Sequence, residues 1–513
     1  MFRSVRNTLR LLTIARVLAR HDALFPLSKL PMTRRIAALA ARVSNRRAAG
    51  RPGERLARAL VELGPSFIKF GQALSTRADL VGDAVAADLS MLQDRIAPFP
   101  FAEVERIVAA EFERPIAELY AAFDPEPIAA ASVAQVHRAV TRDGRTVAVK
   151  ITRPGVEAAF ERDVDLLYWL AEIADRTQPG LRRLRLHESV TAFADTVAME
   201  LDLRFEAAAA SELAENFADD DTFRVPDVLW PLTGKNVLTT AWIENGIPID
   251  ERDRLAAAGF APTAIAERAA RAFFKMVFSD GFFHGDMHPG NLFVGAAGEI
   301  VAVDFGIMGR IGVAERRYLG EMLLAFLNGD YRRAAEVHFE AGYVPPDRSV
   351  DLFAQACRSI AEPILGLPAA EVSVARLLAQ LFKVTETFGM EVQPQLLVLQ
   401  KTMLTAEGIG RGLCPEVNFW ELARPLIEEW MAQNVAPPAK IRRGVEDAWD
   451  AMRRIPEIVR RADAMSRQMA ESGVKLHPDT VRALLDRRRS QIVHTWAPWA
   501  LIVVLMAVLL TRM

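Results

Sequence analysis

The chain has 513 residues, of which 51% are hydrophobic and 25% charged, and its formal net charge is -2. This length allows a large core and more than one domain. The near-neutral charge argues against a nucleic-acid binder, since such domains carry a clear excess of Lys and Arg. Only two cysteines occur, Cys357 and Cys414, and neither has His or Cys companions at metal spacing. This usage argues against a disulfide framework and fits a reducing, cytosolic environment.

Residues 1–60 are predicted to form a basic amphipathic arm, because 14 Lys or Arg lie between Met1 and Arg58 against only Asp22 and Glu54. One helical face carries the arginines Arg3, Arg6, Arg10, Arg16 and Arg20. Another face carries the apolar residues Phe2, Val5, Leu9 and Leu12. Two interpretations remain open. The helix lies on an anionic membrane surface, or it packs on its own domain with a solvated basic face.

The C-terminal segment is strongly apolar, since every residue from Trp496 to Leu510 except Pro498 is apolar. Residues 492–510 are therefore predicted to form a transmembrane helix, just long enough to cross a hydrocarbon core of ~30 Å. Three arginines, 487–489, precede it, so the positive-inside rule places the body of the protein on the cytoplasmic side. A helix buried in the protein or in a dimer is the alternative. Residues 436–490 are predicted to be a basic helical linker.

The middle of the chain predicts two lobes of an α+β fold. Residues 61–123 are rich in helix formers and read as a helical extension, in which 101–123 forms two short helices separated at Pro115. Residues 124–245 contain a hairpin joined at Asp143-Gly144, long helices over 156–175 and 188–216, and two further strands. Residues 246–435 are mostly helical, apart from a second hairpin over 292–303.

The strongest chemical signal is the string H-G-D-M-H-P-G-N over residues 284–291, followed by Asp304-Phe305-Gly306. Phosphoryl transfer needs a carboxylate that orients or deprotonates the acceptor, and oxygen ligands that hold Mg²⁺ against the phosphates. Asp286 and Asn291 have the separation of the kinase H-R-D-x-x-x-x-N loop. The second hairpin would return Asp304 to the same place. Asp286 is therefore predicted to be catalytic, and Asn291 and Asp304 to bind the metal.

A zinc site is the rival interpretation of the same string. His284 and His288 have the spacing of H-E-x-x-H, but that motif needs a continuous helix. Gly285, Pro289 and Gly290 favour a loop instead.

Upstream, Val147-Ala148-Val149-Lys150 resembles the kinase strand whose lysine contacts the α- and β-phosphates. Such a lysine needs a carboxylate partner on the neighbouring helix, and Glu206 is the predicted partner. On a continuous helix Asp202 shares the face of Glu206, whereas Glu200 points elsewhere. The alternative for these carboxylates is a solvated acidic face.

The loop before this lysine lacks the kinase G-x-G-x-x-G pattern. In its place stand residues predicted to bind the nucleotide: Ala129, Ala130, Ala131, Ser132, Val133, Ala134, Gln135 and Val136. Alanine leaves the backbone accessible but disfavours positive φ, so a stiffer loop is expected.

Four strings in this order resemble the UbiB family of atypical protein-kinase-like proteins, the bacterial relatives of the eukaryotic ADCK proteins. They are Lys69-Phe70-Gly71-Gln72, the Ala-rich loop, the E-x-D of Glu200 and Asp202, and H-G-D-x-H-P-G-N. The resemblance covers roughly residue 64 to the end. It implies a two-lobed protein-kinase-like fold, ATP and Mg as cofactors, ATPase activity more readily than protein kinase activity, and a role in ubiquinone biosynthesis at the bacterial inner membrane.

The resemblance also implies a role for Lys69. This lysine would sit over the nucleotide pocket, contact Glu200 and Asp202, and restrain access by protein substrates; spacing alone predicts a helix-surface lysine. The expected partners are ATP, membrane lipid or isoprenoid quinone precursors, and other ubiquinone-biosynthesis enzymes, with no nucleic acid. Two departures from the family pattern stand out. Ala209 replaces an Asn that often follows the E-x-D, and Ala241 stands where the hinge that meets adenine commonly has an acidic residue.

Two other functions remain open. A small-molecule phosphotransferase of the aminoglycoside-kinase type shares H-G-D-x-H-P-G-N, but would not be expected to carry K-x-G-Q. A nucleotide-gated, non-catalytic lipid-binding scaffold is the second, although the predicted catalytic residues are all present.

Overall fold

The computed structural model describes residues 2–24, 50–75, 81–90, 97–177, 186–365, 387–390, 394–414 and 419–434. The chain divides into two units, Met1–Ala432 and Gln433–Met513, and the first contains the elements described below, except the last two residues of the final helix. The predicted linker (436–490) and transmembrane helix (492–510) lie outside the described residues. Within the described ranges, no helix combines the length and apolar character needed to cross a membrane.

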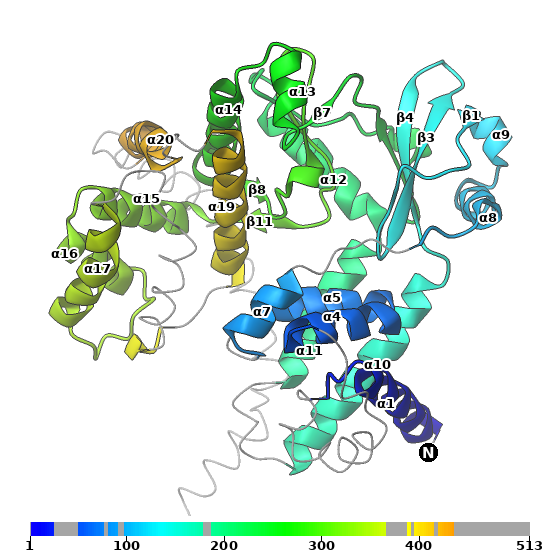
Figure 1. Cartoon of the computed structure of the whole chain (residues 1–513), viewed down its shortest axis with the longest axis horizontal. Helices are drawn as coiled ribbons and strands as arrows, with labels where there is room; N and C mark the ends of the chain where they lie inside the picture. Colours follow the sequence, from blue (N-terminus) through cyan, green and yellow to red (C-terminus); the bar gives the residue numbers. More distant parts are fainter. Residues whose placement is uncertain are drawn as a thin grey trace, which may run out of the picture. The chain divides into compact units, whose positions relative to one another are not determined.

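The smaller lobe is built on an antiparallel sheet in the order β1-β3-β4-β6, with β2 paired to β3 (Figure 1). The strands are β1 (Tyr120–Phe123), β2 (Ala129–Ala130), β3 (Ala134–Thr141), β4 (Thr146–Thr152) and β6 (Val237–Ala241). The predicted β3–β4 hairpin is confirmed, and Gly144 supplies the positive φ of +86° that its turn requires. Alternate residues of β4 (Val147, Val149 and Ile151) are buried in one cluster with residues of α8 (Phe101–Phe112).

Residues 120–123 correct the prediction of a second short helix that continues to Phe123. Helix α9 (Ile116–Leu119) is a single turn, and the chain then pairs with β3 as β1. Tyr120 is buried and its hydroxyl lies 2.9 Å from Thr239 Oγ1. An aromatic side chain that packs on the sheet therefore overrides the local helical tendency.

The helices between β4 and β6 carry the acidic residues of the site. They are α10 (Val156–Thr177), α11 (Leu186–Glu200) and α12 (Leu203–Asn216). The prediction of one continuous helix over 188–216 was wrong, because the chain leaves the helix at Asp202. The Asp202 side chain accepts a hydrogen bond from Arg204 N at 3.1 Å and caps α12. Glu200 and Glu206 are therefore not related by helical spacing.

The larger lobe is mostly helical. Its helices are α13 (Arg252–Ala257), α14 (Pro262–Phe274), α15 (Val313–Leu327), α16 (Tyr331–Glu340), α17 (Val350–Leu365), α19 (Pro394–Leu413) and α20 (Phe419–Asn434). Strands β5 (Phe223–Arg224), β10 (Ile300–Ala302), β9 (Leu292–Val294) and β7 (Ile247–Pro248) form one small sheet, and β8 (Phe282–His284) pairs with β11 (Met308–Arg310). The predicted hairpin over 292–303 is confirmed by the β9–β10 pairing.

The helices of the predicted arm and of the helical extension pack on one another, and two of them, α1 and α5, pack on α10 (Figure 1). The arm forms α1 (Phe2–Arg20) and most of α4 (Pro52–Leu63), and the extension forms α5 (Pro65–Ser75) and α7 (Asp83–Ser90). Their apolar faces share one buried cluster with Leu166 of α10, including Ile14, Leu18, Leu56, Leu60 and Phe67. The helix that carries Lys69, α5, is thus held by a core of its own.

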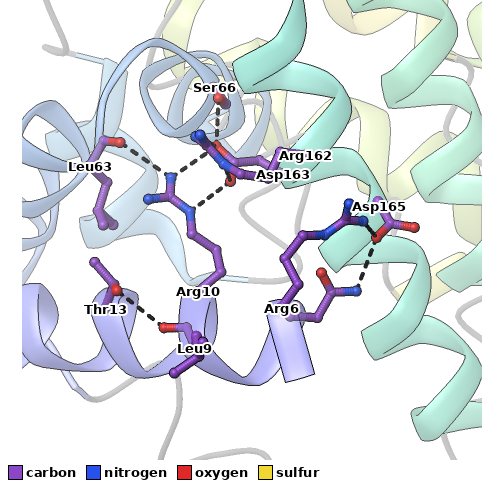
Figure 2. A network of polar contacts seen from close by, with 10 residues as sticks. Arg6, Leu9, Arg10, Thr13, Leu63, Ser66, Arg162, Asp163 and Asp165 are labelled. Atoms are coloured by element: carbon purple, nitrogen blue, oxygen red, sulfur yellow. Dashed lines mark hydrogen bonds and ion pairs between the residues drawn. The ribbon is translucent and has the colours of Figure 1, made fainter. Parts of the chain in front are cut away.

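Helix α1 lies against α10 through its basic face (Figure 2). Arg6 contacts Asp165 at 2.5 Å, and Arg10 donates to both oxygens of Asp163 at 2.7 and 2.9 Å. Packing on its own domain is therefore correct. The basic face is shared between α10 and solvent, because Arg3 and Arg6 contact the carboxylates of α10 and their side chains are still 43% and 57% exposed. The solvent-exposed side chains of α1 also include the apolar residues Val5, Leu9 and Leu12.

Candidate active site

Lys150 links three elements of the site. Its Nζ lies 2.8 and 2.9 Å from the two carboxylate oxygens of Glu206 on α12, and 2.8 Å from Asp304 Oδ1. The ion pair between Lys150 and Glu206 predicted from the sequence is confirmed. Glu206 is 8% exposed and Lys150 17%, whereas the Asp304 side chain is 51% exposed. The ammonium thus reaches from a buried carboxylate to one that a ligand can reach.

The β9–β10 hairpin returns Asp304 beside the catalytic loop, as predicted, since Val303 N donates to Asn291 O at 2.9 Å. Asp304 has a φ of +64°. This left-handed conformation is uncommon for residues other than glycine, although Asp adopts it more readily than most. Strain of this kind gathers at functional sites, where the surrounding structure holds it.

The cluster of Lys150, Glu206 and Asp304 contains one cationic group and two carboxylates. Burial opposes the charge of Lys150, but Asp304 and Glu206 together raise the pKa of this lysine above its usual range. The Lys150 ammonium holds the pKa of Asp304 well below its usual range. Burial raises the pKa of Glu206 in spite of its contact with Lys150, and the charge of Asp304 adds to this effect. One ammonium therefore serves two carboxylates.

Lys69 on α5 forms an ion pair with Glu200, the last residue of α11. The family resemblance implied this contact, whereas helical spacing had placed Glu200 elsewhere. Asp202, the other carboxylate of the E-x-D, contacts Arg204 at 2.7 and 2.9 Å. Hydrogen bonding to Arg204 lowers the pKa of Asp202.

The two histidines of the catalytic loop shape its backbone. His284 is buried; its Nε2 lies 3.1 Å from Val303 O, and its Nδ1 accepts a hydrogen bond from Asp286 N at 3.0 Å. Burial lowers the pKa of His284, which favours the neutral ring. His288 Nδ1 accepts from Gly290 N at 3.2 Å.

The zinc interpretation finds no support in this geometry. His284 and His288 use ring nitrogens to hold the loop, and the loop is not a continuous helix. Within the ranges that the structure describes, no group of three His, Cys, Asp or Glu side chains is placed to hold a metal.

Asp286 and Asn291 face each other across the loop. Asn291 Nδ2 donates to Asp286 O at 3.1 Å, which leaves the amide oxygen as the end that can bind a metal. An amide oxygen and the Asp304 carboxylate form a donor set that suits Mg²⁺, which takes few protein oxygens and keeps phosphate and water ligands. The donor chemistry and the excess of carboxylate thus fit this ion.

The Ala-rich loop is tightly closed by its own backbone. Ala131 N donates to Ala134 O and Arg153 N donates to Val133 O, both at 2.8 Å. No residue from 129 to 136 has a positive φ, as expected for alanine in place of glycine. Ser132 is fully buried, and its Oγ has no hydrogen-bond partner among the described residues. A buried hydroxyl without a partner is uncommon in folded proteins.

Gln135, also predicted to bind the nucleotide, has a structural side chain instead. Its Oε1 accepts from Phe99 N at 3.0 Å, and its Nε2 lies 2.8 Å from His137 Nε2. Val136 pairs with Ala129 on one side and Lys150 on the other. Any contact of Gln135 with a nucleotide would therefore come from its backbone.

Sequence reasoning missed Lys401. This residue lies on α19, 115 residues after Asp286, and its Nζ is 2.8 Å from Asp286 Oδ1. A lysine in a helical segment carries no local signal of such a contact, because the partner comes from a distant part of the chain.

Comparison with known proteins shows which class of protein has this fold and site. Residues 91–338 match the ABC1 atypical kinase-like domain, and residues 357–418 match the UbiB helical domain. The fold of the M. tuberculosis protein Rv3197, solved in complex with erythromycin, is similar: the TM-score is 0.51 at 26% identity, covering 70% of this chain and 90% of that one. The fold and the site thus define an atypical kinase-like protein.

Curated relatives refine this class. The probable protein kinase UbiB of Marinobacter nauticus is 41% identical over 447 residues, which cover 84% of this chain and 80% of the relative. The probable protein kinase UbiB of Cellvibrio japonicus is 41% identical over 456 residues, covering 88% and 82%. The chain belongs to the UbiB family.

Proposed function

We propose that this protein is an ATP- and Mg-dependent phosphotransferase or ATPase of the UbiB type. The observation that carries the proposal is the position of Lys150, whose ammonium bridges buried Glu206 and the accessible carboxylate of Asp304. In a kinase-like site this lysine holds the α- and β-phosphates, and the carboxylate of the D-F-G sequence holds the metal. Bound Mg²⁺ would supply neutralisation of the phosphate charge.

Each remaining site residue has a role in this proposal. Asp304 and Asn291 hold the metal, the Ala-rich loop covers the phosphates, and Ser132 Oγ donates to a phosphate oxygen. Asp286 orients the acceptor and takes its proton. Lys69, paired with Glu200, restrains the access of protein substrates. The acceptor is water in the ATPase reaction.

We further propose a location at the bacterial inner membrane, with the catalytic body on the cytoplasmic side and residues 492–510 as the anchor. The support is the apolar sequence of that segment and the exposed apolar residues Val5, Leu9 and Leu12 of α1. The proposed role is support of ubiquinone biosynthesis. Membrane lipid or isoprenoid quinone precursors and other enzymes of that synthesis are its partners, in keeping with the relatives named UbiB.

The aminoglycoside-kinase alternative is disfavoured, because the family match includes the helical domain at residues 357–418 as well as the kinase-like domain. The scaffold alternative is disfavoured because Lys150, Asp304, Asn291 and Asp286 are all present and brought together. ATP turnover separates the scaffold from the enzyme.

The test is thermal unfolding of the full-length protein, purified in detergent, with and without MgATP or MgADP. A ligand that binds only the folded state stabilises it by about 2.7 kcal/mol at 100 times its Kd. Lys150→Ala should weaken this gain, whereas Arg254→Ala should not, because Arg254 is an exposed residue paired with Glu251. A melting temperature that no nucleotide changes, in folded wild-type protein, would refute the proposal.

A further inference from the structure

Helix α19 is seated directly on the catalytic loop. A Cβ added to Gly285 would lie 2.9 Å from Val398 Cγ1 and 2.8 Å from Ile307 Cγ2, closer than real Cβ atoms approach. A larger residue before Asp286 would therefore force the side chains of Val398 and Ile307 to move. The helix and the loop are in close contact at the residue next to the catalytic carboxylate.

The same face of α19 carries Lys401, one helical turn after Val398. Lys401 Nζ lies 2.8 Å from Asp286 Oδ1, and the two side chains are 47% and 34% exposed. Neighbouring residues fix the helix: Leu399 is buried, and Thr402 is fully buried with its Oγ1 donating to Val398 O at 2.9 Å. The lysine thus extends from a fixed backbone to a carboxylate that remains open to an acceptor.

We propose that Lys401 is a positioning residue for phosphoryl transfer, which rests on the function proposed above for Asp286. Its ammonium holds Asp286 Oδ1 and so turns Oδ2 toward the acceptor. In the transfer step the acceptor oxygen forms a bond to the γ-phosphorus of ATP, and the bond from that phosphorus to the β–γ bridging oxygen breaks. ADP leaves with the electron pair, and the acceptor proton passes to Asp286 Oδ2.

An ordinary surface ion pair predicts a different outcome for the same change. Exposed pairs contribute little to stability and nothing to catalysis. A positioning role predicts a loss of turnover without a matching loss of stability or of nucleotide binding, because small misplacements of a catalytic group lower the rate strongly.

The experiment compares four full-length proteins purified in detergent: wild type, Lys401→Ala, Lys401→Arg and Arg411→Gln. Arg411 is a matched control, since it lies on the same helix and pairs with Glu407 at 2.8 Å, not with the loop. The measurements are kcat and KM for ATP hydrolysis and the nucleotide-induced shift of the melting temperature. Lys401→Ala should lower kcat by about 10- to 100-fold with KM and the shift unchanged. Lys401→Arg should recover most of the rate, and Arg411→Gln should keep the wild-type kcat and KM.

The outcomes separate this inference from the proposed function. If Lys401→Ala turns over ATP at or above the wild-type rate while nucleotides still stabilise it, the positioning role is wrong and the proposed function stands. If wild type is neither stabilised by nucleotide nor active, both are wrong. Should Lys401→Ala melt early without nucleotide, Lys401→Gln replaces it, because glutamine keeps part of the stem and removes only the charge.

Discussion

Two clusters of charged residues join segments that are far apart in the sequence, and they differ in how positive and negative groups are matched. In the anchor cluster (Arg10, Asp163 and Ser66) the carboxylate accepts two hydrogen bonds from the Arg10 guanidinium and one from the Ser66 hydroxyl, and the Arg162 guanidinium adds two longer ones at 3.4 Å (Figure 2). In the lysine cluster (Lys150, Glu206 and Asp304) one ammonium serves two carboxylates. A buried charge that the fold itself neutralises is structural, whereas an excess of carboxylate leaves a place for a cationic ligand.

The two clusters also differ in the solvent exposure and backbone conformation of their aspartates. Asp163 is 5% exposed and lies within the regular helix α10. Asp304 is 51% exposed and has a left-handed φ of +64°. The first carboxylate is closed off by its partners, and the second is held in a strained conformation at an accessible surface.

The largest expected effect concerns the unbalanced cluster. Asp304→Asn should lower ATP turnover by about 1,000-fold, because it removes the proposed principal metal ligand and the charge stabilisation that the metal would supply. The melting temperature without nucleotide should change little, while its increase with MgATP should be lost. The measurement is turnover beside thermal unfolding. Turnover within a few-fold of wild type would show that Asp304 does not hold the metal.

The anchor cluster should respond in the opposite way. Asp163→Ala should lower the free energy of unfolding by about 3 kcal/mol, because it leaves the Arg10 guanidinium largely buried without its partner. Denaturant unfolding measures this, and ATP turnover of the folded protein should persist. The control is the double variant Arg10→Met, Asp163→Leu, which should regain most of the stability, since apolar groups of similar volume replace the pair. A double variant as unstable as Asp163→Ala would contradict this account.

Lys69 lies in the extension but contacts the site, so it tests whether the two regions are coupled. Lys69→Arg should change nucleotide affinity, ATP hydrolysis or self-phosphorylation by about 10-fold, because it alters the ion pair with Glu200 that we propose restrains the access of protein acceptors. A radiolabel assay of this variant beside Lys69→Arg, Asp304→Asn measures the effect, and the double variant should be inactive. If Lys69→Arg matches wild type in all three measurements, the restraining role fails.

The sequence predicted those parts of the site that depend on local patterns. The β3–β4 hairpin follows from alternating residues around Asp143-Gly144, and the β9–β10 hairpin places Asp304 beside Asn291. The pair between Lys150 and Glu206 could be predicted because a strand-borne lysine of this type requires a carboxylate on a neighbouring helix.

Two features of the site were not predicted from the sequence: a helix break that depends on capping, and a contact between distant parts of the chain. Glu200 to Glu206 reads as one helix, yet Asp202 caps a new one, and this break brings Glu200 to Lys69. Aspartate before a helical run is a capping signal that could have been used. The contact of Lys401 with Asp286 joins residues 115 positions apart, and no local pattern encodes it.

Ser66 provides the smallest and most selective test of the comparison. Its hydroxyl donates to Asp163 Oδ2 at 2.8 Å, three residues before Lys69 on α5. Ser66→Ala should cost only about 1 kcal/mol of stability, because Arg10 still neutralises Asp163 and a single hydrogen bond is lost. Ser75→Ala is the matched control on the same helix, since the Ser75 hydroxyl donates only to the local carbonyl of Gln72 and its loss should change stability less. Both variants should keep wild-type ATP turnover.

Equal losses of stability in the two variants would show that the contact between Ser66 and Asp163 adds nothing to stability. A change of turnover in Ser66→Ala alone would show that the anchor cluster acts on the site through α5 and is not purely structural.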